Sequence, residues 1–183
     1  MGNISSNTAR SAIVQDYQKQ LKSGNPINID LSNDKEVSAQ EFQNLYQNII
    51  KGNTPVNLNF SDSDVSPIQM AYVSNLLEKN LVSSLNISRV ELEPNMLDFL
   101  KLGIFKGSGL QNLITDGCQG IGTEELDAIT NKITGKITQI PEEVEKSIDQ
   151  WELQRNNTIE QTYKLTSASA ARINNQTTQN ILS

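Results

Sequence analysis

Four short runs of alternating apolar and polar residues recur along the chain. They cover residues 28–32, 57–61, 84–88 and 112–115, and alternation with a period of two is typical of a strand that buries one face. The equivalent positions in these runs follow one another at steps of 29, 27 and 27 residues, at Ser32, Ser61, Ser88 and Thr115. Such even spacing predicts a structural repeat of about 28 residues.

The segments between these strands carry start signals for helices. Ser38 with Glu41 and Ser66 with Gln69 have the spacing of capping boxes. Pro94 is typical of a first helical position, and Thr123 is expected to be an N-cap. Apolar residues follow each signal at helical spacing, and Gly52 is expected to end the first of these helices. Each repeat is therefore predicted to be a strand, a turn and a helix.

The repeat resembles a known family. Segment 110–118 reads L-x-x-L-x-T-x-x-C, which is similar to the leucine-rich-repeat framework L-x-x-L-x-L-x-x-N/C, and residues 58–60 and 85–87 supply the same L-x-L core. The resemblance is to the longer, ribonuclease-inhibitor-like repeats, which have a true helix in each unit. It covers residues 27–133.

This resemblance implies an α/β solenoid with short parallel strands on the concave face, helices on the convex face and a helical cap at each end. Asp34, Ser63 and Val90 depart from the family by standing where it usually has Asn. The alternative is an ordinary three-layer α/β or α+β fold.

The flanking segments are interpreted as caps. Residues 1–25 form an N-terminal helical cap, residues 26–140 hold about four repeats, and residues 141–183 form a C-terminal helical cap and a polar tail. Ile137 and Ile140 are expected in a last short strand, and Trp151 is expected to seal the last repeat. Beyond Arg155 the chain is expected to continue as a projecting helix that frays into disorder.

Strand alternation assigns the polar residues of each run to the exposed concave surface. This surface comprises Asn28, Asp30, Ser32, Asn57, Asn59, Ser61, Ser84, Asn86, Ser88, Asn112, Ile114 and Asp116. Solenoids commonly bind partners on this face. We expect the partner-binding residues among them to be Asn28, Asp30, Asn57, Asn59, Ser61, Asn86, Ser88, Ile114 and Asp116; the alternative is that these polar residues only solvate an exposed face.

Composition excludes several kinds of chemistry. The formal charge of −6 disfavours nucleic acid as a partner. The absence of histidine removes the commonest general base and zinc ligand. The one cysteine, Cys118, cannot form an internal disulfide; at a repeat position that accepts Asn or Cys it is expected to be a buried, inert thiol.

Candidate sites elsewhere are few. The acidic run 61–64 lacks the spacing of a calcium loop and is expected to be a solvated turn. Gly2 and the serine four positions later satisfy a short myristoylation pattern, but one acyl chain without a basic patch gives no stable membrane anchor. We expect no catalytic residue, metal or cofactor.

These observations favour a monomeric cytoplasmic module that binds a protein partner. The alternatives are a carboxylate enzyme built on Asp30, Asp62 or Asp64, and a structural scaffold with no dedicated ligand. A short leucine-rich-repeat chain without a signal peptide also resembles the effectors that intracellular bacteria such as Legionella deliver into the host cytosol. The polar residues 166–183 are similar to a C-terminal signal for type IV secretion.

Overall fold

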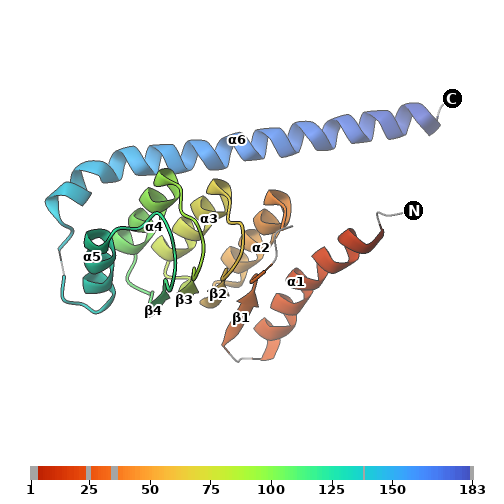
Figure 1. The fold of residues 1–183 in the computed structure, drawn as a ribbon. Coiled ribbons are helices and arrows are strands. Elements are labelled where there is room, and N and C mark those ends of the chain that lie inside the picture. Colours follow the sequence, from red (N-terminus) through yellow and green to blue (C-terminus); the bar gives the residue numbers. More distant parts are fainter. Residues whose placement is uncertain (1–3, 24–25, 34–36, 138, 182–183) are drawn as a thin grey trace.

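Strands and helices alternate along most of the chain in the computed structural model, which describes residues 4–23, 26–33, 37–137 and 139–181 (Figure 1). The helices are α1 (Ile4–Ser23), α2 (Ala39–Gly52), α3 (Pro67–Glu78), α4 (Pro94–Lys106), α5 (Thr123–Ile133) and α6 (Glu142–Ile181). The strands are β1 (Ile27–Asp30), β2 (Val56–Asn59), β3 (Val82–Asn86) and β4 (Asn112–Ile114). The chain is therefore α/β, and each strand falls in or beside a run that the alternation predicted.

The four strands form one parallel sheet in the order β1-β2-β3-β4. Leu58 pairs with Ile29 on one side and with Leu85 on the other, and Leu85 pairs with Leu113. A helix leads from each of β1, β2 and β3 back to the start of the next strand, and α5 follows β4, so that α2, α3, α4 and α5 lie side by side along one face of the sheet (Figure 1). The opposite face is left to the polar residues of the strands.

The core lies between the sheet and these helices. Alternate strand residues enter it fully, as Val56 and Leu58 do in β2 at 1% and 2% exposure. Aromatic rings fill the space above them, with the Phe42 and Phe60 centroids 5.7 Å apart and the Phe42 and Tyr72 centroids 6.3 Å apart. Burying one such side chain stabilises the fold by about 1.5–3 kcal/mol.

The helix boundaries confirm three of the four predicted start signals, and one of these is Pro94, the first residue of α4. Complete capping boxes join Ser38 with Glu41 at α2 and Ser66 with Gln69 at α3. The cap expected at Thr123 is wrong, because Gly122 is the N-cap of α5 and makes no side-chain cap bond.

The end of α2 also differs from the prediction. Gly52 is still helical, and Asn53 ends the helix in the left-handed conformation with φ 49°. A Cβ atom on Gly52 would lie 2.2 Å from the hydroxyl oxygen of Tyr17. Glycine is therefore needed here because α1 packs closely against this turn, and not because it ends the helix.

Helix α1 packs against α2 and β1 at one end of the sheet. Tyr17 is 1% exposed, and its hydroxyl donates to the backbone carbonyl of Asn48 at 3.1 Å. The carboxamide of Gln20 lies at the outer edge of β1, where Nε2 donates to the Asn28 carbonyl at 3.0 Å and Oε1 accepts from the Asn28 N–H at 2.8 Å. One side chain thus completes the backbone hydrogen bonding of an edge strand.

Helix α6 takes a path that the sequence analysis did not predict. It crosses the outer side of α3 and α4 (Figure 1). Trp151 packs on α4, where Nζ of Lys101 lies 4.9 Å from its ring centroid, so the expectation that Trp151 seals the last repeat is wrong. Arg155 explains the path, because its Nη1 reaches Oε2 of Glu78 in α3 at 2.6 Å.

Two further expectations for the C-terminal part are corrected. Ile137 and Ile140 lie outside any strand: α5 ends at Ile133, Gly135 follows in the left-handed conformation, and the Ile137 N–H bonds back to the Asn131 carbonyl at 3.1 Å. The helix expected beyond Arg155 is present, but the fraying expected toward its end is not, because α6 continues to Ile181 without a break.

Candidate functional site

The predicted surface residues form two registered rows across the exposed face of the sheet. The first row consists of Asn28, Asn57, Ser84 and Asn112, and the second of Asp30, Asn59, Asn86 and Ile114. Every member is exposed or partly exposed. The parallel register therefore brings together residues that are 27 to 29 positions apart in the chain.

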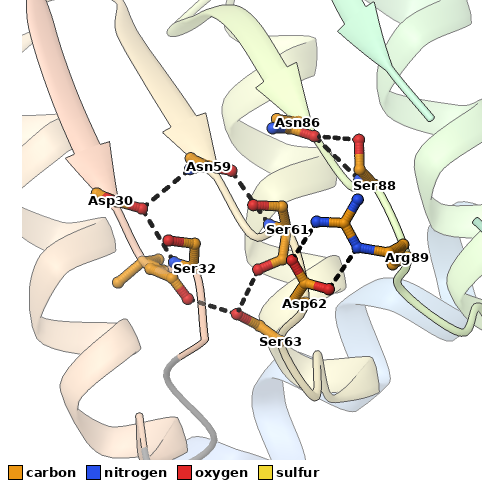
Figure 2. Close-up of polar contacts among 10 residues, drawn as sticks. Asp30, Ser32, Asn59, Ser61, Asp62, Ser63, Asn86, Ser88 and Arg89 are labelled. Atoms are coloured by element: carbon orange, nitrogen blue, oxygen red, sulfur yellow. Dashed lines mark hydrogen bonds and ion pairs between the residues drawn. The ribbon is translucent and has the colours of Figure 1, made fainter. Parts of the chain in front are cut away.

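Side-chain hydrogen bonds connect neighbours within these rows. Nδ2 of Asn57 donates to Oδ1 of Asn28 at 2.8 Å, and Nδ2 of Asn59 donates to Oδ1 of Asp30 at 3.0 Å (Figure 2). At the far end, Nδ2 of Asn112 lies 3.4 Å from the Ser84 hydroxyl. These bonds hold the amides in fixed orientations on the surface.

The second row also fixes the turns that leave the strands. Oδ1 of Asp30, Asn59 and Asn86 accepts the backbone N–H two residues later, from Ser32 at 3.0 Å, Ser61 at 3.1 Å and Ser88 at 3.0 Å (Figure 2). This is the Asx-turn arrangement. Hydrogen bonds from Ser32, and to a smaller extent from Asn59, lower the pKa of Asp30.

Ser88 differs from the expectation that the residues after the strands face solvent. Ser88 is only 6% exposed, because its hydroxyl turns back to donate to Oδ1 of Asn86 at 2.7 Å. Ser32 and Ser61 are partly exposed, and Asp116 is exposed in the fourth unit. Of the predicted surface residues, Ser88 alone is therefore buried.

A third row was missed by the sequence analysis. Residues with a positive φ occupy the same place after each strand, at Asn33, Asp62, Arg89 and Gly117, with φ values of 55°, 58°, 59° and 70°. Asn, Asp and Gly tolerate this left-handed conformation best. They follow one another at steps of 29, 27 and 28 residues, a signal that the sequence already held. The fourth register position, predicted at Thr115, is wrong by one residue, because Asn86 pairs with Ile114 and Asp116 is therefore the equivalent of Ser88.

Arg89 is the exception in this row, and it forms an ion pair with its neighbour. Its Nε and Nη2 donate to the two carboxylate oxygens of Asp62 in the preceding unit (Figure 2). Hydrogen bonds from this guanidinium lower the pKa of Asp62. Because both side chains are partly open to solvent, the pair orients the two groups more than it stabilises the fold.

Ser63 stands at the turn position where leucine-rich repeats usually have Asn. It is 6% exposed, and its hydroxyl donates to the backbone carbonyl of Leu31 in the preceding unit. A carbonyl that would otherwise be buried without a partner is thereby satisfied. At the same position, the third unit has an apolar Val90 that is 1% exposed.

Cys118 occupies this position in the fourth unit and is half-buried, not fully buried as expected. In the part of the chain that the structure describes, β4 is the last strand of the sheet, so no further unit packs beside this position. Burial raises the pKa of the thiol. The protonated form is therefore favoured, which agrees with the expectation of an unreactive cysteine.

An open hollow of about 660 Å³ lies beside these turns. Its walls are mostly polar and carry four carboxylates and one arginine; they consist of Asn33, Asp62, Ser63, Asp64, Val65, Arg89, Glu91, Glu93 and Gln119. Among the residues with described positions, no group of three or more Asp, Glu or Cys side chains is arranged to hold a metal ion. Gly2, the predicted acylation site, lies outside the described residues.

Comparisons with known proteins do not assign the chain. No protein-family model matches it, and no curated protein is significantly similar. Within the described ranges, none of the helices has the length and hydropathy needed to cross a membrane. The secretion signal in residues 166–183 stays a prediction.

Proposed function

We propose that this chain is a leucine-rich-repeat solenoid that binds a protein partner through the two polar rows of its sheet. The repeat interpretation is supported by strand-turn-helix units that share one register and by left-handed turns at matching positions. The buried Ser63 hydroxyl, which bonds to the preceding unit as the family's turn residue would, is a second support.

The observation that carries the binding proposal is the registered polar surface. Its amides and carboxylates are held by hydrogen bonds to neighbouring strands before any partner arrives, as between Asn59 and Asp30. Side chains that are already ordered lose less conformational entropy on binding, so more of each new hydrogen bond contributes to affinity.

The location of the other elements supports the choice of face. The outer side of α3 and α4 is covered by α6, and the outer edge of β1 is bonded to Gln20. The polar face of the sheet has no described helix packed on it (Figure 1). It is the open surface on which a partner can contact all four units together.

The alternative of a carboxylate enzyme receives less support. Asp62 is engaged by Arg89, and hydrogen bonds lower the pKa of both Asp62 and Asp30. A general acid needs a carboxyl group whose pKa is raised toward neutrality. These two carboxylates are instead suited to accept hydrogen bonds from a partner.

The test replaces surface residues that do not hold the turns. Asn57→Arg with Ser84→Arg places two long cations in the first row, whereas Asn59 and Asn86 are left intact because they accept turn N–H groups. The matched control, Gln40→Arg with Asn44→Arg, lies on exposed positions of α2. Both variants are expected to keep the circular dichroism spectrum and the melting temperature.

Proteins captured by the full chain are quantified by mass spectrometry and compared with those captured by the two variants. A captured protein is then purified, and its affinity for each chain is measured by calorimetry. We expect the first-row variant to lose affinity at least about tenfold, which is about 1.4 kcal/mol, and the α2 variant to bind normally. Equal affinity of all three chains would contradict the proposal.

A further inference from the structure

The two edges of the sheet are not equivalent. At β1 the Gln20 carboxamide bonds to both backbone groups of Asn28 that point away from the sheet. At β4 no strand, helix or side chain of the described ranges pairs with the outer edge. An unpaired edge strand is a site at which another strand can be added.

The outward groups of β4 can be identified from the observed bonds. The Ile114 carbonyl accepts from the Ile87 N–H at 2.9 Å, so the polar groups of Ile114 point toward β3. Backbone groups of successive strand residues point to opposite sides. The N–H and the carbonyl of Leu113 therefore both point outward.

Apolar side chains at this end are less covered than their equivalents in the inner units. Leu58 and Leu85 are 2% and 0% exposed, whereas Leu113, which pairs with Leu85, is only half-buried. Leu126 on α5 is also half-buried and is not packed into the core. A terminal repeat of this kind gains stability when a neighbour covers it.

We propose that a second copy of this chain pairs with this edge, β4 against β4, antiparallel about a two-fold axis at Leu113. In an antiparallel ladder, two residues that lie opposite each other in a hydrogen-bonded pair exchange both N–H···O bonds. Leu113 presents the required donor and acceptor, so its N–H and carbonyl in one copy can bond to the carbonyl and N–H of Leu113 in the other copy. The result is one continuous sheet through both molecules.

The contact is two-fold because the outer edge of β1 is already occupied. A head-to-tail arrangement would place β4 of one copy against β1 of the next, where Gln20 already occupies the Asn28 groups. Only β4 is left for pairing, and the assembly therefore closes as a dimer and does not grow into a filament.

Charge complementarity on α5 favours the same arrangement. The two-fold axis would bring α5 of each copy side by side and antiparallel. Its first turn carries Glu124 and Glu125, and its last turn carries Lys132. The acidic start of one helix would then face the basic end of the other. This dimer replaces the monomer expected from the sequence, which did not reveal the unequal edges.

Cross-linking tests the register. In this pairing residue 112 lies opposite residue 114 of the other copy, within disulfide distance. The full chain carrying Cys118→Ser, Asn112→Cys and Ile114→Cys is expected to run as a covalent dimer on a non-reducing gel after mild oxidation. The control carrying Cys118→Ser and Asn112→Cys alone is expected to remain monomeric. No covalent dimer in the first, or equal dimer in both, would overturn the proposal.

Sedimentation equilibrium tests the dimer itself. The wild-type chain is expected to approach twice its mass of 20.3 kDa as concentration rises. Glu125→Lys and Lys132→Glu should each weaken the dimer, and combining them should restore it because opposite charges face each other again. A mass of 20.3 kDa at every concentration, or a dimer that neither single variant weakens, would overturn the proposal. No binding partner is needed, so the result is independent of the proposed function.

Discussion

Arg155 of α6 and Glu78 of α3 form an ion pair in which the guanidinium is almost fully enclosed. Their side chains are 3% and 25% exposed, and Nη1 lies 2.6 Å from Oε2. Nη1 also lies 3.5 Å from the Ser74 hydroxyl, and Lys106 contacts the other Glu78 oxygen at 3.1 Å. This cluster fixes the long C-terminal helix on the helices that pack against the sheet.

The two partners of this pair should have unequal effects on stability. Arg155→Met leaves Glu78 paired with Lys106 and should cost about 1–3 kcal/mol, because the main loss is hydrogen bonds to a charged group. Glu78→Leu leaves the enclosed guanidinium with two distant partners, the Ser74 hydroxyl at 3.5 Å and Glu152 at 3.8 Å, and should cost about 3–5 kcal/mol. Urea unfolding followed by the fluorescence of Trp151 measures both, and a larger loss in Arg155→Met would contradict this prediction.

Acid should weaken the attachment of α6. Burial raises the pKa of Glu78, but hydrogen bonds from Arg155 and Lys106 outweigh it, so the pKa in the folded chain lies below its ordinary value of 4.5. A lowered pKa contributes stability that is complete above the unfolded value and is lost as pH falls through the folded one.

We expect the free energy of unfolding to decrease as the pH is lowered below 4.5. Urea titrations at a series of pH values measure this decrease. Glu78→Gln cannot titrate at this position, and its stability should change less over the same acid range. If the wild type and Glu78→Gln lose stability in parallel, Glu78 is not the responsible group.

The sequence predicted those parts of the fold that local patterns determine. Strand alternation located all four strands, and the spacing of Ser38 and Glu41 identified a complete capping box. The same alternation placed the polar rows, because parallel strands at an even spacing bring equal positions into register.

Features that depend on contacts between distant segments were not predicted. Arg155 stands at the start of a polar segment in which no local pattern points to a buried ion pair, and only the folded chain places it beside Glu78, 77 positions earlier. The carboxamide of Gln20 gave no sign that it would bond to an edge strand. Ser88 turns inward because Asn86 accepts its hydroxyl, a choice that alternation alone does not determine.

Alanine substitutions should distinguish the serines that cap a helix from Thr123, which was predicted to be a cap but is not one. Ser38→Ala or Ser66→Ala should each cost about 1 kcal/mol, because both hydroxyls bond to the first turn of their helix. Thr123→Ala should cost much less, since Thr123 is already helical and Gly122 is the cap. Thermal melts of the three variants make the comparison, and a cost at Thr123 equal to that at Ser38 would restore the original assignment.

Shortening the C-terminal helix should locate the part of it that stabilises the fold. The described contacts of α6 with the rest of the chain extend from Val144 in the core to Tyr163, whose hydroxyl accepts from Gln47 of α2 at 3.3 Å. Deleting residues 166–183 should therefore leave the melting temperature unchanged within a few degrees. Deleting residues 150–183 removes Trp151 and Arg155, which are 8% and 2% exposed, and should lower it strongly. Differential scanning calorimetry of the two truncated chains measures their melting temperatures against that of the full chain. A large loss from the shorter deletion would mean that residues 166–181 hold contacts that stabilise the fold.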